Sequence, residues 1–142
     1  MAVQNELWKA IQNHLGYNEE EMKLFRENPI NEDILAKLPE FGAKTIVFEV
    51  IESNGCNSGH KKGDKFYFDF AGNLITKKNP SKICIYALQT MLPAIFAANE
   101  LFYAGINPNE MRFKNAGCFD VGVKCGGWGR ILLRFSMEDR IK

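Results

Sequence analysis

Apolar residues in the first forty positions recur at the spacing of amphipathic helices. The first such stripe consists of Leu7, Trp8, Ile11 and Leu15. Gly16 follows it and is suited to ending a helix. Asn18, followed by three glutamates, predicts a second helix with an N-cap side chain and acids near the positive end of the helix dipole. Asn31 predicts the start of a third helix, which extends to Pro39 and Gly42.

From Lys44 onward the pattern is that of β-strands. Residues 44–52 are rich in β-branched and aromatic side chains and are apolar on both faces, as in a central strand. Residues 65–70 alternate, which places three phenylalanines on one face. Residues 130–137 alternate in the same way, and residues 111–114 are a candidate for a short strand before them.

A long apolar stretch between these strands has a helical period. We expect its helix to begin at Asn79-Pro80-Ser81 and to end at Gly105, with Pro93 causing a kink on the solvent side. The expected buried seam consists of Cys84, Leu88, Met91, Ile95, Ala98 and Phe102.

The order of these elements predicts an α+β fold. We expect a mostly antiparallel sheet of about four strands with one long helix packed on it, preceded by a small N-terminal helical lobe. The lobe, residues 1–42, is expected to be an appendage of a core domain of residues 43–142.

Charge differs between the two predicted parts. The lobe has eight acidic and four basic residues, whereas the core has nine acidic and fourteen basic residues. An acidic helical lobe is a candidate surface for a homo-oligomer or another partner. In the core, lysines that would attract a small anionic ligand are Lys61, Lys62, Lys65, Lys77, Lys78 and Lys82.

Composition narrows the class of protein. Hydrophobic residues make up 46% and charged residues 25%, average values that argue against intrinsic disorder. Polar residues interrupt the longest apolar stretch, so we expect no membrane span, and the N-terminus lacks the pattern of an export signal. No basic stripe alternates with exposed aromatic residues, so we expect no nucleic-acid binding. The expected location is the cytoplasm.

All four cysteines lie at junctions of predicted elements in the core. Cys56 lies with His60 in the loop between the first two strands, and Cys84 lies at the start of the long helix. Cys118 and Cys125 lie in the loop before the last strand. A reducing compartment keeps thiols free, so these positions favour metal, catalytic or core roles over disulfides.

A metal site is the first interpretation. If the two loops meet at one end of the sheet, Cys56, His60, Cys118 and Cys125 would form a zinc site with three thiolates and one imidazole. The four cysteines would alternatively hold an iron–sulfur cluster.

A thiol site for a small anionic ligand or substrate is the second interpretation. The positive end of the long helix would favour a Cys84 thiolate, with His60 as its base and Asp120 and Arg130 as further binding residues. The competing interpretation makes Cys84 a core residue. Asp64 is expected to serve its own turn, whereas Asp120 fits either a turn or acid–base chemistry.

The run Gly126-Gly127-Trp128-Gly129 also has two interpretations. It is expected to be a turn or bulge that leads into the last strand, with Trp128 filling the edge of the core. Its backbone N–H groups would alternatively bind an anion together with Arg130.

Several spaced motifs resemble a family of small uncharacterised prokaryotic proteins that share one conserved domain. These motifs are Gly55-Cys56, Gly59-His60-Lys61, Gly63-Asp64-Lys65-Phe66, Cys84-x-x-Ala87 and Cys118-Phe-Asp120-x-Gly122. The resemblance covers about residues 44–138 and implies that Cys56, Cys84 and Cys118 are the recurrent thiols. It implies no activity, and the family pattern does not include Cys125.

The sequence therefore predicts a small protein that binds a metal ion or cluster through loop cysteines and a histidine. A thiol-bearing enzyme or ligand-binding protein is the alternative, and an accessory or oligomerising subunit is the third possibility.

Overall fold

The computed structural model describes residues 3–140 and divides into two compact units between Phe41 and Gly42. The predicted boundary lies one residue later. No helix among the described residues combines the length and the apolar character that crossing a membrane requires.

The N-terminal unit consists of three helices: α1 (Asn5–Leu15), α2 (Glu19–Glu27) and α3 (Pro29–Gly42), whose last residue lies just past the boundary. Its small core is formed by one buried residue from each helix, namely Trp8, Met22 and Leu35. The predicted helical lobe is therefore present, with its own apolar core.

The ends of these helices follow their capping residues. Gly16 adopts the left-handed conformation after α1, and Asn18 is the N-cap of α2, as predicted, where it forms a capping box with Glu21. The predicted start of the third helix at Asn31 is wrong, because α3 begins at Pro29. The Asn28 side chain accepts a hydrogen bond from Ile30 N (3.1 Å), and proline is well tolerated in a first helical turn.

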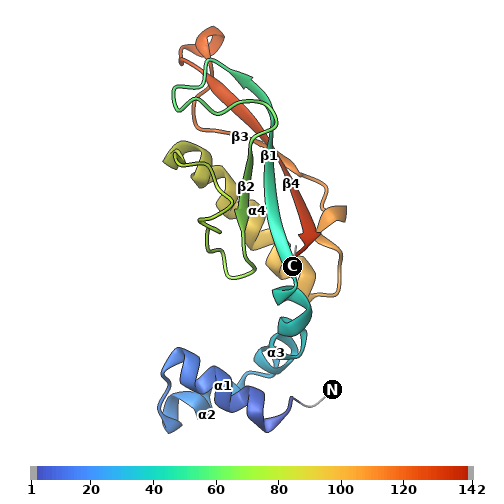
Figure 1. The fold of residues 1–142 in the computed structure, drawn as a ribbon. Helices are drawn as coiled ribbons and strands as arrows, with labels where there is room; N and C mark the ends of the chain where they lie inside the picture. The colour runs from blue at the N-terminus through green and yellow to red at the C-terminus, as the bar shows by residue number, and fades with distance from the viewer. Residues whose placement is uncertain (1–2, 141–142) are drawn as a thin grey trace. The chain divides into compact units, whose positions relative to one another are not determined.

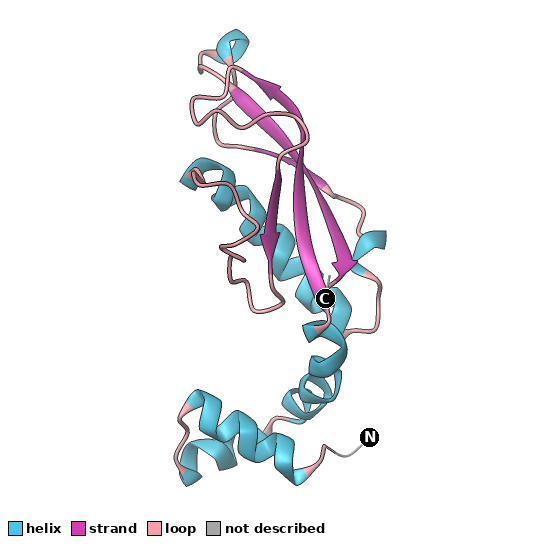
Figure 2. Ribbon diagram, in the orientation of Figure 1, coloured by secondary structure: helices cyan, strands magenta, loops and turns pink. Residues whose placement is uncertain are grey.

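The second unit contains the predicted α+β fold. Four strands, β1 (Lys44–Asn54), β2 (Lys65–Phe68), β3 (Asn115–Gly117) and β4 (Arg130–Asp139), form an antiparallel sheet in the order β2-β1-β4-β3 (Figures 1 and 2). The long helix α4 (Ile85–Tyr103) lies along this sheet.

The core of this unit lies around the central strand β1. Phe48 of β1 stands opposite Phe66 of β2 and Phe135 of β4, and all three side chains are buried. The helix contributes Ala87, Met91, Ile95 and Ala98 as its buried residues. Pro93 lies on the exposed side of α4, as expected, so its ring does not disturb the packing of the helix on the sheet.

The long helix begins later than predicted, at Ile85, with Cys84 as its N-cap residue. The side chain of Asn79 does not cap a helix but pairs with the edge of β2. It accepts a hydrogen bond from Tyr67 N (2.9 Å) and donates one to Tyr67 O (2.8 Å). Asn79 therefore covers part of the exposed edge of β2.

The predicted short strand at residues 111–114 is also wrong, because β3 comprises residues 115–117. Residues 108–110 form a 3-10 turn, and its Asn109 side chain binds both the N–H and the C=O of Met137 in β4. The Asn109 side-chain amide thus binds the backbone groups of β4 with which a strand at residues 111–114 would have to pair.

Candidate functional site

The loop after β1 and the loop before β4 meet at one end of the sheet, as the sequence predicts. Asn54 pairs with Arg130 in the strand ladder, and Gly55 lies against Gly129 just beyond it. The approach is so close that a Cβ atom on Gly129 would overlap the Gly55 carbonyl. Glycine at this position is therefore a requirement of backbone packing.

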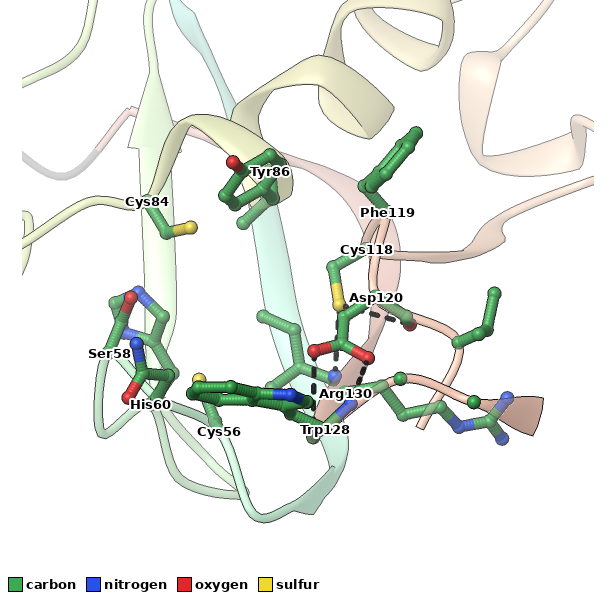
Figure 3. A pocket seen from close by; sticks show the side chains of 17 residues that line it. Cys56, Ser58, His60, Cys84, Tyr86, Cys118, Phe119, Asp120, Trp128 and Arg130 are labelled. Carbon is green, nitrogen blue, oxygen red and sulfur yellow. Dashed lines mark hydrogen bonds between the residues drawn. The ribbon is translucent and has the colours of Figure 1, made fainter. Parts of the chain in front are cut away.

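A cavity of about 690 Å³ lies at this junction (Figure 3). Predicted site residues that line it are Cys56, His60, Cys84, Cys118, Asp120 and Arg130. Cys125 is exposed and is not among the lining residues. The structure thus gathers six of the seven predicted site residues around one cavity, from two loops, the start of α4 and the start of β4.

His60 is the most buried polar residue of the cavity wall, with 4% of its surface exposed. Its ring packs edge-on against Phe66, with the ring centroids 5.0 Å apart, and its carbonyl accepts a hydrogen bond from Ser53 Oγ (2.6 Å). Its Nε2 atom is buried and has no hydrogen-bond partner in the described part of the chain. Burial lowers the pKa of His60 below 6.5, against the opposing effect of Asp64, which favours a neutral imidazole.

Three thiols surround the same space. Figure 3 shows Cys56 and Cys84 on the side of His60 and Cys118 on the opposite side, beside Asp120. The Cys118 sulfur is held by two backbone groups: it accepts from Ile131 N (3.4 Å) and its S–H donates to Asp120 O (3.7 Å). All four cysteines are free thiols.

Asp120 organises the loop before β4. Its carboxylate accepts hydrogen bonds from Gly122 N (2.9 Å), Trp128 N (3.0 Å) and Gly129 N (3.1 Å). The bond from Gly122, together with those from Trp128 and Gly129, lowers the pKa of Asp120, although desolvation opposes the shift. Backbone N–H groups of the glycine run therefore do bind an anion, and that anion is the protein's own side chain.

The charges around the cavity differ from the predicted basic pocket. The guanidinium of Arg130 extends away from His60 and Cys56 in Figure 3. Among the described lining residues there is no lysine, and Asp64 serves its turn, as expected, by accepting from Lys61 N (2.9 Å). The wall beside His60 therefore carries no fixed positive charge.

Three aromatic residues of the site were not identified from the sequence. Tyr86, Phe119 and Trp128 line the cavity, and Trp128 is 80% exposed, so the expectation that it fills the core edge is wrong. The physical reason is that its flanking glycines offer no side chains to pack against. A tryptophan between glycines in a loop is the signal that would have found it.

Potential metal ligands do not converge as the first interpretation requires. Within residues 3–140, no three side chains of histidine, cysteine, aspartate or glutamate are grouped so that they could hold a metal ion. Cys56, His60 and Cys118 share the cavity, but Cys125 lies outside its lining.

Comparison with known proteins found no matching family model, no matching curated protein and no matching solved structure. The resemblance to a prokaryotic family stays a prediction.

Proposed function

We propose that residues 42–140 form a domain that binds a small neutral organic ligand in the cysteine-lined cavity. The observation that carries this proposal is His60 Nε2, a buried polar atom without a partner. A buried polar group that makes no hydrogen bond costs roughly 1–3 kcal/mol, so such groups are rare unless a ligand, ion or water completes them.

The cavity has the properties of a small-molecule site. Its volume of about 690 Å³ falls within the range of about 300–1,000 Å³ that is common for ligand pockets. The wall combines aromatic rings with a few polar groups, of which the His60 imidazole is the most enclosed. This mixture favours an organic molecule with a largely apolar body and one polar group.

The two charged residues that line the cavity offer no free charge to a ligand beside His60, which favours a neutral ligand. The Asp120 carboxylate is already bound by three backbone N–H groups, and Arg130 is directed away from the histidine. The thiols of Cys56, Cys84 and Cys118 are then the nucleophilic groups that such a ligand would meet. This makes the cavity suited to thiol chemistry on a bound molecule.

Nuclear magnetic resonance with a library of small neutral fragments tests the proposal. We expect fragments at about 1 mM, a concentration that detects binding of about −4 kcal/mol, to shift the signals of His60 and of the residues around Gly55 and Ile131. The signals of the N-terminal core around Trp8 should not move. A library without a single fragment that shifts the cavity signals would refute the proposal.

A metal ion is the second candidate occupant, and His60 Nε2 is the observation that favours it. Thiolate and imidazole are the ligands that zinc prefers, and Cys56 lies four residues before His60 on the same wall. Elemental analysis of protein purified without oxygen tests this candidate. Stoichiometric zinc or iron that is lost in the Cys56→Ser protein would support it, and metal-free protein with unchanged stability in chelator would oppose it.

A further inference from the structure

Aromatic side chains are gathered and exposed at the cavity to a degree that their packing does not explain. Trp128 is 80% exposed, Phe119 is 71% exposed and Tyr86 is 56% exposed. Soluble proteins seldom leave several large aromatic residues in contact with water at one place unless the patch binds something. Tyr86 and Phe119 already stack on each other, with centroids 5.8 Å apart, and Trp128 has no aromatic ring stacked on it within residues 3–140.

The tryptophan is nevertheless held in place by its backbone. Its N–H donates to Asp120 Oδ1 (3.0 Å), and Gly129 N donates to Oδ2 of the same carboxylate (3.1 Å). Gly129 in turn packs directly on the backbone of Gly55. The exposed ring is therefore mounted on an anchored loop segment.

The ring of Trp128 faces the open space of the cavity. Figure 3 shows the indole edge-on, with Tyr86 and Cys84 on the far side of the space and His60 beyond one end of the ring. A flat molecule lying on this face would have its edge toward the histidine.

We propose that the ligand is a flat aromatic or heteroaromatic molecule that stacks on Trp128 and presents a polar atom on its edge toward the His60 imidazole. This inference rests on the proposed function, because it names the chemical class of the ligand in the same cavity. Stacking on an exposed aromatic ring tolerates many ring systems, whereas the buried imidazole selects those with a suitably placed donor or acceptor.

The chain offers a direct reporter for this arrangement. Its two tryptophans are Trp8, in the N-terminal core, and Trp128. In a Trp8→Phe protein, the tryptophan fluorescence, excited selectively over tyrosine, comes from Trp128 alone. A ring that stacks on the indole is expected to quench it.

The experiment uses pairs of neutral carboxamides that differ only in ring planarity, such as benzamide and cyclohexanecarboxamide, and a larger bicyclic pair. We expect the flat members to quench Trp128 and to bind about tenfold or more tightly than their saturated partners, the preference that stacking of this kind provides. Trp128→Ala should abolish the preference, and Trp128→Phe should keep part of it. Affinities for these variants, which lack the indole reporter, come from the shifts of His60 and backbone signals.

The matched control is Phe113→Ala, since Phe113 is 71% exposed but does not line the cavity. This variant should bind all probes as the parent does. Equal binding of flat and saturated probes, or a preference that survives in Trp128→Ala, overturns the inference and leaves the proposed function standing. A set in which no probe of either kind binds at its solubility limit overturns the inference as well, and the fragment library then decides the proposed function separately.

Discussion

Replacing His60 with phenylalanine tests the role of the buried imidazole directly. The ring is 4% exposed and packs edge-on against Phe66, an arrangement that a phenyl ring retains. The backbone of residue 60 keeps its hydrogen bond from Ser53 Oγ, because that bond uses the carbonyl group. The substitution therefore removes the polar ring atoms and little else.

The expected effect on stability is a gain. Burial of Nε2 without a partner destabilises the folded protein by roughly 1–3 kcal/mol. Phenylalanine removes this cost, but its slightly larger ring fits the packed site less well and offsets part of the gain. We expect the free energy of unfolding of this unit to rise by about 1 kcal/mol in His60→Phe. Stabilisation by removal of a polar group would identify it as one retained for binding.

Native-state hydrogen exchange is the suitable assay, because amides of β1 and β4 report on the unit that contains the cavity. Fragment binding should be weakened or lost in the same protein. A loss of stability of about 1 kcal/mol or more would refute the reasoning, since it would mean that the imidazole makes a stabilising polar contact in the free protein.

The pH dependence of stability provides a second measurement on His60. Its pKa is lowered on folding, so between the folded value and 6.5 the unfolded chain holds more protons than the folded chain. The free energy of unfolding is therefore not reduced by His60 above pH 6.5. It decreases as the pH falls toward the folded pKa, by at most about 1.4 kcal/mol per pH unit for one proton. His60→Phe should remove this decrease, and His14→Gln, at an exposed position, should keep it.

The other predictions concern the loops that form the cavity. A bulky maleimide should modify Cys125 first, because it is the exposed cysteine, and mass spectrometry that finds Cys118 modified earlier would contradict the structure. Gly129→Ala should lower the free energy of unfolding by roughly 2–4 kcal/mol, because its Cβ atom would overlap the Gly55 backbone. Gly59→Ala, at a positive φ with open space around it, should lower it by about 1 kcal/mol. Equal losses of stability in chemical denaturation would argue against the close approach of Gly129 and Gly55. Asp120→Asn should speed amide hydrogen exchange at Gly129 and at Trp128. The parent protein should show the same change only as the pH falls below 3.8, since hydrogen bonds lower the pKa of this carboxyl. Unchanged exchange in the variant would show that the Asp120 carboxylate does not anchor this loop.

The fold was predictable where one residue type decides the backbone. The change from helical to alternating periodicity at Lys44 correctly separates the helices from the sheet, and Asn18 correctly starts α2. Two of the errors occurred where an asparagine side chain binds a strand edge. Asn79 and Asn109 each occupy an edge of the sheet, and such long-range pairing leaves no local pattern in the sequence.

The location of the site could be predicted from the sequence, whereas its charge and its aromatic character could not. Cys56, His60 and Cys118 were correctly predicted to meet at one end of the sheet, because they lie in loops at the ends of strands. The orientation of Arg130 and the exposure of Trp128 depend on how two loops pack, which periodicity and spacing do not encode.

The segment from Asn115 to Arg130 then has a single structural explanation. Its cysteine motif and its glycine run look separate in the sequence, but the Asp120 carboxylate joins them by binding Gly122 N, Trp128 N and Gly129 N. A side chain at position 127 would overlap that carboxylate, and one at position 129 would overlap the Gly55 carbonyl, so both glycines permit this closure. The closed loop carries Cys118 on one side and Trp128 on the other. The glycines therefore hold a thiol and an aromatic ring at fixed positions around the cavity that His60 closes from the opposite wall.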